Sequence, residues 1–269
     1  MRTNTVIKTK HSFHLGYRAL AGALLLALPT TGYSVDLASP GANLSQRIKK
    51  ELAQHLKQSG AGFENLLSNW ERNYGTQAVS PLLSIARDKK NKDTYRYVAI
   101  LGAARLGGAQ AKKEITGFLS DRVWMIRMAS LRGLTALYKA QRITEGEITT
   151  GISRLLTDPA LVVRNEAVIS MRKLQIQSLT PKLIRVLVDK KNYHHGKPLW
   201  VPEKALFALQ ELKAPGSLAK GLYPVLQTQK DPTFLNLVVN TLEKMTGKTL
   251  ARGQPIRLRV QAWKKELKN

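Results

Sequence analysis

Two lysine-rich turns carry the side chains best suited to binding chemistry in this 269-residue chain. Both begin with the tetrapeptide Asp-Lys-Lys-Asn, at 88–91 and at 189–192, and the second continues as Tyr-His-His-Gly-Lys-Pro-Leu-Trp. Ammonium groups attract anions, and the neighbouring rings add stacking or sugar contacts. The residues of the candidate binding site are therefore Lys89, Lys90, Lys92, Lys190, Lys191, Tyr193, His194, His195, Lys197 and Trp200.

No catalytic constellation stands out in the sequence. Cysteine is absent, which excludes disulfides, thiolate metal sites and cysteine nucleophiles. Neither Gly-x-Ser-x-Gly nor His-Glu-x-x-His occurs, and Asp and Glu together number only 18. The adjacent side chains of His194 and His195 diverge, and no third metal ligand lies nearby in sequence. We therefore expect no catalytic residues, no metal and no cofactor, which means a protein that is not an enzyme.

The chain is strongly basic, with a formal net charge of +25 and a pI near 10.4. Such a charge favours acidic partners but carries no information about the fold. The partners that fit are an acidic protein or an anionic envelope polymer or lipid surface, with nucleic acid as a further alternative. A competing interpretation is that the lysine-rich turns only keep the protein soluble. The apolar content of 43% is sufficient for a packed core.

The first 34 residues have the three-part pattern of a secretory signal peptide. Basic residues precede an apolar run from Ala19 to Leu28, Pro29 breaks the run, and small residues follow up to Ser34. The run has about half of the ~20 residues that span a bilayer as a helix. We expect a periplasmic or secreted mature chain without a transmembrane span. Four of the +25 charges lie before residue 35, which leaves +21. The alternatives are an uncleaved segment that tethers the chain to a membrane and a buried first helix.

The elements that position the turns repeat along residues 78–246. Apolar patterns of helical spacing occur there in pairs, and each second pattern alternates small and large residues three or four positions apart. The repeated anchor positions are Tyr95, Ile126, Val163, Val201 and Phe234. Successive anchors are 31, 37, 38 and 33 residues apart, a period that predicts stacked helical hairpins. Small central residues such as Ala99 and Ser130 would let neighbouring helices approach closely.

Both ends of the repeat region are predicted to carry capping elements. Residues 35–77 contain two amphipathic patterns and are expected to form an N-terminal capping hairpin. Residues 247–269 contain a last amphipathic pattern with Val260 and Trp263 on one face, which is typical of a C-terminal capping helix. No useful strand-type alternation occurs. We therefore predict an all-α fold, an α-solenoid of about five to six stacked helical hairpins.

The repeated units resemble the HEAT repeats, and within them the bacterial HEAT-like or lyase-type repeats. The resemblance rests on an Asp, a short turn, a Val-Arg or Ile-Arg step, and small and large residues at helical spacing. It implies a superhelix in which the Asp and the Arg form a ladder between adjacent units. The residues that match these ladder positions are Asp88, Arg96, Asp121, Arg127, Asp158 and Arg164.

The last two units depart from this pattern. The fourth unit keeps Asp189 but has Pro202 in place of the arginine, and the fifth has Thr228 and Leu235 at the ladder positions. We therefore expect the ladder to end there. The turns of a solenoid lie along one edge, where insertions often mark the binding face. With layers about 8–10 Å apart, the two lysine-rich turns would lie about 24–30 Å from each other.

The resemblance also bears on function, because HEAT arrays are mostly noncatalytic binding scaffolds. Taken together with the signal-peptide pattern and the basic charge, it indicates a basic scaffold, exported from a bacterial cytoplasm, that binds a protein or a polyanion. The alternative is a DNA-binding protein related to the HEAT-like glycosylases that act on alkylated bases. Those enzymes use a basic concave face with a Trp and a carboxylate, for which Trp124 and Asp121 are the residues to consider.

Overall fold

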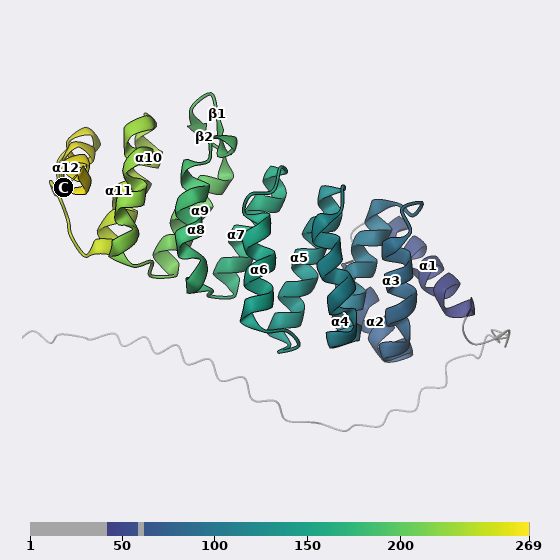
Figure 1. The fold of residues 1–269 in the computed structure, drawn as a ribbon. Helices are drawn as coiled ribbons and strands as arrows, with labels where there is room; N and C mark the ends of the chain where they lie inside the picture. The colour runs from purple at the N-terminus through teal and green to yellow at the C-terminus, as the bar shows by residue number, and fades with distance from the viewer. Residues whose placement is uncertain (1–41, 59–61, 269) are drawn as a thin grey trace, which may run out of the picture. The chain divides into compact units, whose positions relative to one another are not determined.

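The computed structural model describes residues 42–58 and 62–268, which are mostly α-helical (Figure 1). The prediction of an all-α fold is confirmed at this level. The expected signal peptide, residues 1–34, lies outside the described residues, as do residues 35–41 of the expected N-terminal hairpin. Within the described residues, none of the helices combines the length and apolar character that crossing a bilayer requires.

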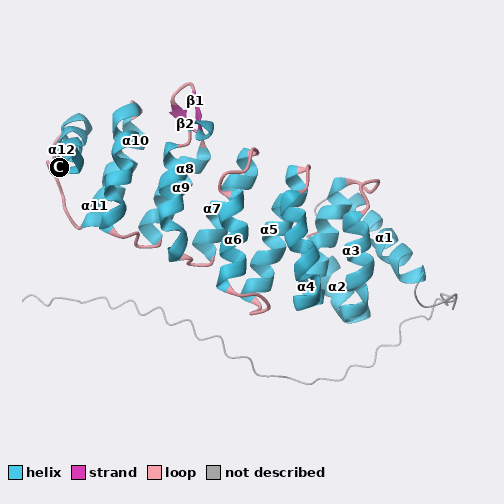
Figure 2. Ribbon diagram, in the orientation of Figure 1, coloured by secondary structure: helices cyan, strands magenta, loops and turns pink. Residues whose placement is uncertain are grey.

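Helices account for nearly all of the regular structure. In chain order they are α1 (Ala42–Lys57), α2 (Phe63–Tyr74), α3 (Val79–Arg87), α4 (Asp93–Gly117), α5 (Trp124–Lys139), α6 (Glu145–Leu155), α7 (Leu161–Lys173), α8 (Thr180–Val188), α9 (Trp200–Glu211), α10 (Tyr223–Thr228), α11 (Pro232–Thr246) and α12 (Ile256–Lys268). Strand pairing within the described residues is confined to β1 (Tyr193–His194) and β2 (Lys197–Pro198), drawn in magenta in Figure 2.

The second helix of each pair in the central region packs against the second helices of the neighbouring pairs. The helices α4, α5, α7, α9 and α11 contact one another in this order, and α3, α6, α8 and α10 pack against or beside them (Figure 1). The long α4 is two helical segments, because Gly108 has φ 50° and ψ −136° and breaks the helical geometry. The residues after this break therefore form the first helix of the next pair.

Small residues make this close packing sterically feasible. Ala99, Ser130, Ala167 and Ala205 lie in α4, α5, α7 and α9, respectively, and have 0% exposure. A Cβ added at Gly133 of α5 would lie only 3.2 Å from the Cβ of Ala104 in α4. The Ser130 hydroxyl donates a hydrogen bond to the Ile115 carbonyl, so its burial leaves no unpaired polar group.

The ends of the described region are held by tryptophans. Trp70 of α2 is fully buried, and its indole N–H donates to Glu51 of α1 at 2.8 Å. The Tyr74 hydroxyl also donates to Glu51, and burial followed by this carboxylate raises the pKa of Tyr74 to about 12. Trp263 of α12 is equally buried, and α12 packs against α10 and α11. Each terminal helix is thereby attached to the row of central helices.

In the last pair, the aspartate that precedes the second helix is not at the position that the repeat pattern indicates. Thr228, which the sequence pattern places at the Asp position, is the last residue of α10. Asp231 instead accepts a hydrogen bond of 2.8 Å from the Phe234 backbone N–H and caps α11. Pro232 follows within the first turn, where its missing N–H is not needed.

Candidate binding site along the loop edge

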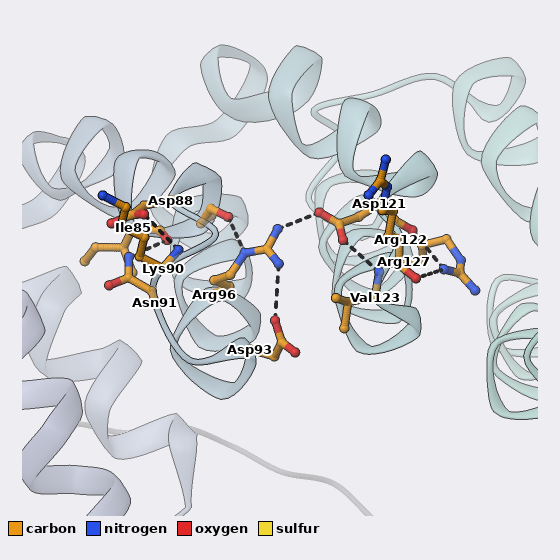
Figure 3. A network of polar contacts seen from close by, with 11 residues as sticks. Ile85, Asp88, Lys90, Asn91, Asp93, Arg96, Asp121, Arg122, Val123 and Arg127 are labelled. Carbon is orange, nitrogen blue, oxygen red and sulfur yellow. Dashed lines mark hydrogen bonds and ion pairs between the residues drawn. The ribbon is translucent and has the colours of Figure 1, made fainter.

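The turns that join the two helices of each pair lie next to one another. We call residues 88–92, 121–123, 156–160, 189–199 and 229–231 the loop edge. Arginines connect four of these turns in series: Arg96 reaches the second turn, Arg127 the third and Arg164 the fourth. Both Asp-Lys-Lys-Asn turns therefore belong to one edge, and Figure 3 shows the first of them beside the turn that follows it.

Arg96 makes the first connection and is almost fully buried, with 3% of its side chain exposed. Its Nη2 donates to Asp121 at 2.5 Å and its Nη1 to Asp93 at 3.2 Å, while its Nε donates to the Ala86 carbonyl (Figure 3). Asp121 also accepts from the Val123 backbone N–H at 2.8 Å. The carboxylate that starts α5 is thus neutralised by an arginine of the preceding pair.

Arg127 repeats the arrangement one pair further along. Its Nε and Nη2 donate to the two carboxylate oxygens of Asp158 at 2.6 and 2.7 Å, a bidentate pair. Its Nη1 donates to the backbone carbonyls of Asp121 and Arg122. The hydrogen bond to Asp158 raises the pKa of Arg127 above its usual range. Asp158 also accepts from the Ala160 backbone N–H, so its two oxygens are fully engaged.

Arg164 makes the third connection without a carboxylate partner. Its Nε donates to Asn192 Oδ1 at 2.8 Å and its Nη2 to the Lys191 carbonyl at 3.0 Å. Its Nη1 donates to the carbonyls of Asp158 and Pro159. Asp189 matches the ladder pattern by sequence, but its carboxylate instead accepts from the Lys191 backbone N–H. Burial lowers the pKa of Arg164, although four neutral oxygens hold the guanidinium.

The shared Asp-Lys-Lys-Asn tetrapeptide folds in the same way at both places. Asp88 accepts from the Lys90 backbone N–H at 3.0 Å, and Asp189 accepts from that of Lys191 at the same distance. The Asn91 amide donates back to the Ile85 carbonyl and the Asn192 amide to the Val186 carbonyl. The turn therefore uses its Asp and Asn internally and leaves its lysines exposed. Those exposed at the two turns are Lys89, Lys90, Lys92, Lys190, Lys191 and Lys197.

The remaining predicted site residues lie on or beside a hairpin at the second turn. His195 and Gly196 both have positive φ, 48° and 77°, as a tight two-residue hairpin turn requires. His194 and His195 are exposed, and their ring centroids are 4.2 Å apart. Trp200 is 52% exposed at the start of α9. Stacking surface is therefore available beside the lysines.

Tyr193 is the exception among these residues, because its hydroxyl is already engaged. It donates to the Leu187 carbonyl, and burial raises the pKa of this hydroxyl. Its ring packs edge-on against Phe234 with centroids 6.4 Å apart. This aromatic contact joins the fourth turn to α11, whereas in α9 the ladder arginine is replaced by Pro202. Tyr193 consequently supports the edge and offers only its ring face to a ligand.

A second row of polar contacts, absent from our sequence prediction, crosses the central helices. Arg132 of α5 donates to Glu166 of α7 at 2.8 Å, and Arg172 of α7 donates to Glu211 of α9 at 2.8 Å. The residues of these pairs are 34 and 39 positions apart, near the repeat period. That recurrence is the signal that could have found them. The row engages carboxylates of the second helices and leaves the lysines of the loop edge uncompensated.

The two residues considered for base excision lie close together in the chain, and the carboxylate of Asp121 already has partners. Trp124 is 41% exposed, directly after the turn that contains Asp121. The Asp121 carboxylate, however, is held by Arg96 and by the Val123 N–H. The described residues include no group of three His, Asp or Glu side chains that could hold a metal ion.

Comparisons with known proteins do not identify a family. No protein-family model matches the chain, and the searches of curated proteins and solved structures found no match either. Evidence on function therefore comes from the geometry and charge of the loop edge.

Proposed function

We propose that this protein is a noncatalytic, basic scaffold that binds an acidic partner along its loop edge. The proposal includes a HEAT-like solenoid architecture, with residues 78–246 as the repeats, 35–77 as the N-terminal cap and 247–269 as the C-terminal cap. It also includes export from a bacterial cytoplasm, on the strength of the signal-peptide pattern in residues 1–34.

One observation carries the proposal: the acidic groups of the loop edge are used internally and its basic groups are not. Asp121 and Asp158 are paired with buried arginines. Within the described residues, none of the exposed basic side chains of this edge forms an ion pair. These side chains are Lys89, Lys90, Lys92, Arg122, Lys190, Lys191, Lys197 and Lys230. Such a surface attracts polyanions at long range and is sensitive to salt.

Charge reversal at the second turn tests the proposal. The double variant Lys190→Glu, Lys191→Glu is expected to weaken binding of poly-L-glutamate at least about tenfold at low salt, because both ammonium groups are exposed and each favourable charge contact becomes repulsive. Binding by the unchanged protein should also weaken steeply between about 50 and 200 mM salt, as screening increases. Isothermal titration calorimetry at several salt concentrations measures both effects.

A matched control separates the loop edge from the overall charge. Lys139 and Lys173 are exposed at the C-terminal ends of α5 and α7, whereas the loop edge adjoins the N-terminal ends. A 16-residue helix is about 24 Å long, so Lys139 lies far from the edge. The variant Lys139→Glu, Lys173→Glu has the same net charge as the test variant and should retain most of the binding. Equal losses in the two variants would mean that the net charge, and not this edge, binds the polymer.

A further inference from the structure

Two adjoining hollows lie between the hairpin at the second lysine-rich turn and the turn before α11. One is a cleft of about 500 Å³ between the end of α8, the hairpin and α10, and the other is a hollow of about 420 Å³ at the hairpin tip. Gly196 and Thr228 line both, so the two spaces adjoin each other. Their linings differ in chemistry, which indicates a ligand with two unlike parts.

The larger space, which we call the Val188 cleft, is mainly apolar. The residues that line it include Leu187, Val188, Tyr193 and Pro224, together with Lys190. Val188 is 44% exposed, one of the few large apolar side chains with such exposure among the described residues. An exposed aliphatic group in a concave site gains free energy when another apolar group covers it.

Gln229 provides a second and independent observation in the same cleft. Its side-chain Oε1 is buried and accepts no hydrogen bond from the described protein. A buried acceptor without a donor is unfavourable, and native proteins rarely leave one unpaired. Because Oε1 has almost no exposed surface, a bound group with an N–H donor would satisfy it once the Gln229 side chain rotates toward the cleft. Acyl chains have no such donor, whereas every residue of a peptide except proline has one.

The smaller hollow is polar and basic. Lys197 and Lys230 line it together with His195, and its one carboxylate is that of Asp231. That carboxylate accepts the Phe234 backbone N–H as the cap of α11. The hollow therefore favours a carboxylate placed directly beside the group that enters the Val188 cleft.

We propose that the Val188 cleft and the adjoining basic hollow bind an acidic segment of a partner protein. An aliphatic or aromatic side chain of the segment enters the cleft, a backbone N–H donates to Gln229 Oε1, and a neighbouring Asp or Glu lies between Lys197 and Lys230. This inference rests on the proposed function and narrows it from any acidic polymer to an acidic peptide with an apolar anchor.

Two short peptides and one polymer test the inference with the full chain. The acetylated and amidated peptides Glu-Asp-Leu-Asp-Glu and Glu-Asp-Ser-Asp-Glu have the same charge and differ in one side chain. The leucine peptide is expected to bind about tenfold more tightly, since its side chain is removed from water in the cleft. Poly-L-glutamate reports the charge contribution alone. Calorimetry at low salt measures all three affinities.

Three variants test whether the difference in affinity between the two peptides arises in the Val188 cleft. Val188→Gln should remove most of the preference for leucine without changing the charge, whereas Val188→Ile should keep it. Gln229→Leu should weaken the leucine peptide about fivefold yet leave the melting temperature unchanged or higher, because it removes a buried unpaired acceptor. A residue with only a structural role would lower the stability and the affinity together. Circular dichroism checks folding in each case.

The outcomes separate this inference from the proposed function. Failure of poly-L-glutamate to bind would overturn both. Binding of poly-L-glutamate with equal affinities for the two peptides would overturn the inference alone. The inference would also be overturned if the cleft held another occupant. An acyl chain would be indicated if Val188→Gln abolished binding to phosphatidylglycerol vesicles but not the leucine preference. A second copy of the chain would be indicated if Val188→Gln abolished self-association in sedimentation experiments.

Discussion

Replacement of Asp158 by alanine is expected to lower the free energy of unfolding by about 3–5 kcal/mol, because it leaves the buried Arg127 guanidinium without its counter-charge. Only 10% of the Arg127 side chain and 3% of the Asp158 side chain are exposed. Two hydrogen bonds of 2.6 and 2.7 Å are lost together. The Ala160 backbone N–H loses its acceptor as well, which weakens the start of α7.

The measurement is urea-induced unfolding followed by circular dichroism. The control is Glu266→Ala, which removes a salt bridge to Lys248 whose side chains are 58% and 37% exposed. Exposed pairs contribute about 0–1 kcal/mol, so this control should unfold at nearly the same urea concentration as the unchanged protein. A loss for Asp158→Ala as small as that of the control would show that the arginine connections do not stabilise the stack.

The contact between Arg127 and Asp158 is one of the structural features that could be predicted from the sequence. Helical periodicity predicts the all-α class, because apolar residues three or four positions apart lie on one face of an α-helix. The recurrence of an aspartate and an arginine marks the turn and the second helix of successive helix pairs. In the structure, Arg96 and Arg127 reach the aspartates in the turn of the next pair, 25 and 31 residues further along the chain. The local pattern and the repeat period are therefore sufficient to predict such contacts from the sequence.

The sequence pattern is less informative where the turn lengthens. Between Asp189 and α9 the chain inserts a hairpin, and the position that faces Arg164 is taken by Asn192. Which of two nearby polar residues meets a buried arginine depends on the path of the turn in space, and no spacing rule records that path. The same limit applies to Asp231, which caps α11 in place of the expected Thr228.

The hollows beside the hairpin are formed jointly by two neighbouring helix pairs, so no single segment of the sequence contains them. Val188 ends α8 and Gln229 follows α10, and each is unremarkable in its own segment. Only the stacking of one pair on the next places an exposed valine beside an unpaired amide oxygen. The basic composition, by contrast, is visible at once. Sequence therefore indicates an acidic partner, and structure supplies the place where such a partner gains an apolar contact.

Replacement of Asn192 by alanine is expected to lower the free energy of unfolding by about 3–4 kcal/mol, much more than the same change at Asn91. Asn192 is fully buried and bridges two groups: its amide donates to Val186 at 2.8 Å and its Oδ1 accepts from Arg164 at 2.8 Å. Without it, a buried carbonyl and a buried guanidinium N–H both lose a partner, and each loss is unfavourable by about 1–3 kcal/mol.

Asn91 is the matched control because it occupies the same place in an identical tetrapeptide. Its amide donates to Ile85 at 3.0 Å, but no arginine in the described residues reaches its side chain. Asn91→Ala should therefore lose only the turn contact, about 1 kcal/mol. Urea unfolding of the two variants under the same conditions gives the comparison. Equal losses would mean that the tetrapeptide, rather than its link to Arg164, determines the stability of the edge.

The coupling to Arg164 is then measured by a double-mutant cycle. In an Arg164→Met background the buried charge is gone, so Asn192→Ala should have nearly the small effect of Asn91→Ala. Arg164→Met alone can be mild, since an apolar side chain replaces a buried cation that has no carboxylate partner. If Asn192→Ala remained strongly destabilising in that background, Asn192 would act through the turn itself. The hairpin with Tyr193, His194 and His195 would then be held in place independently of the arginine series.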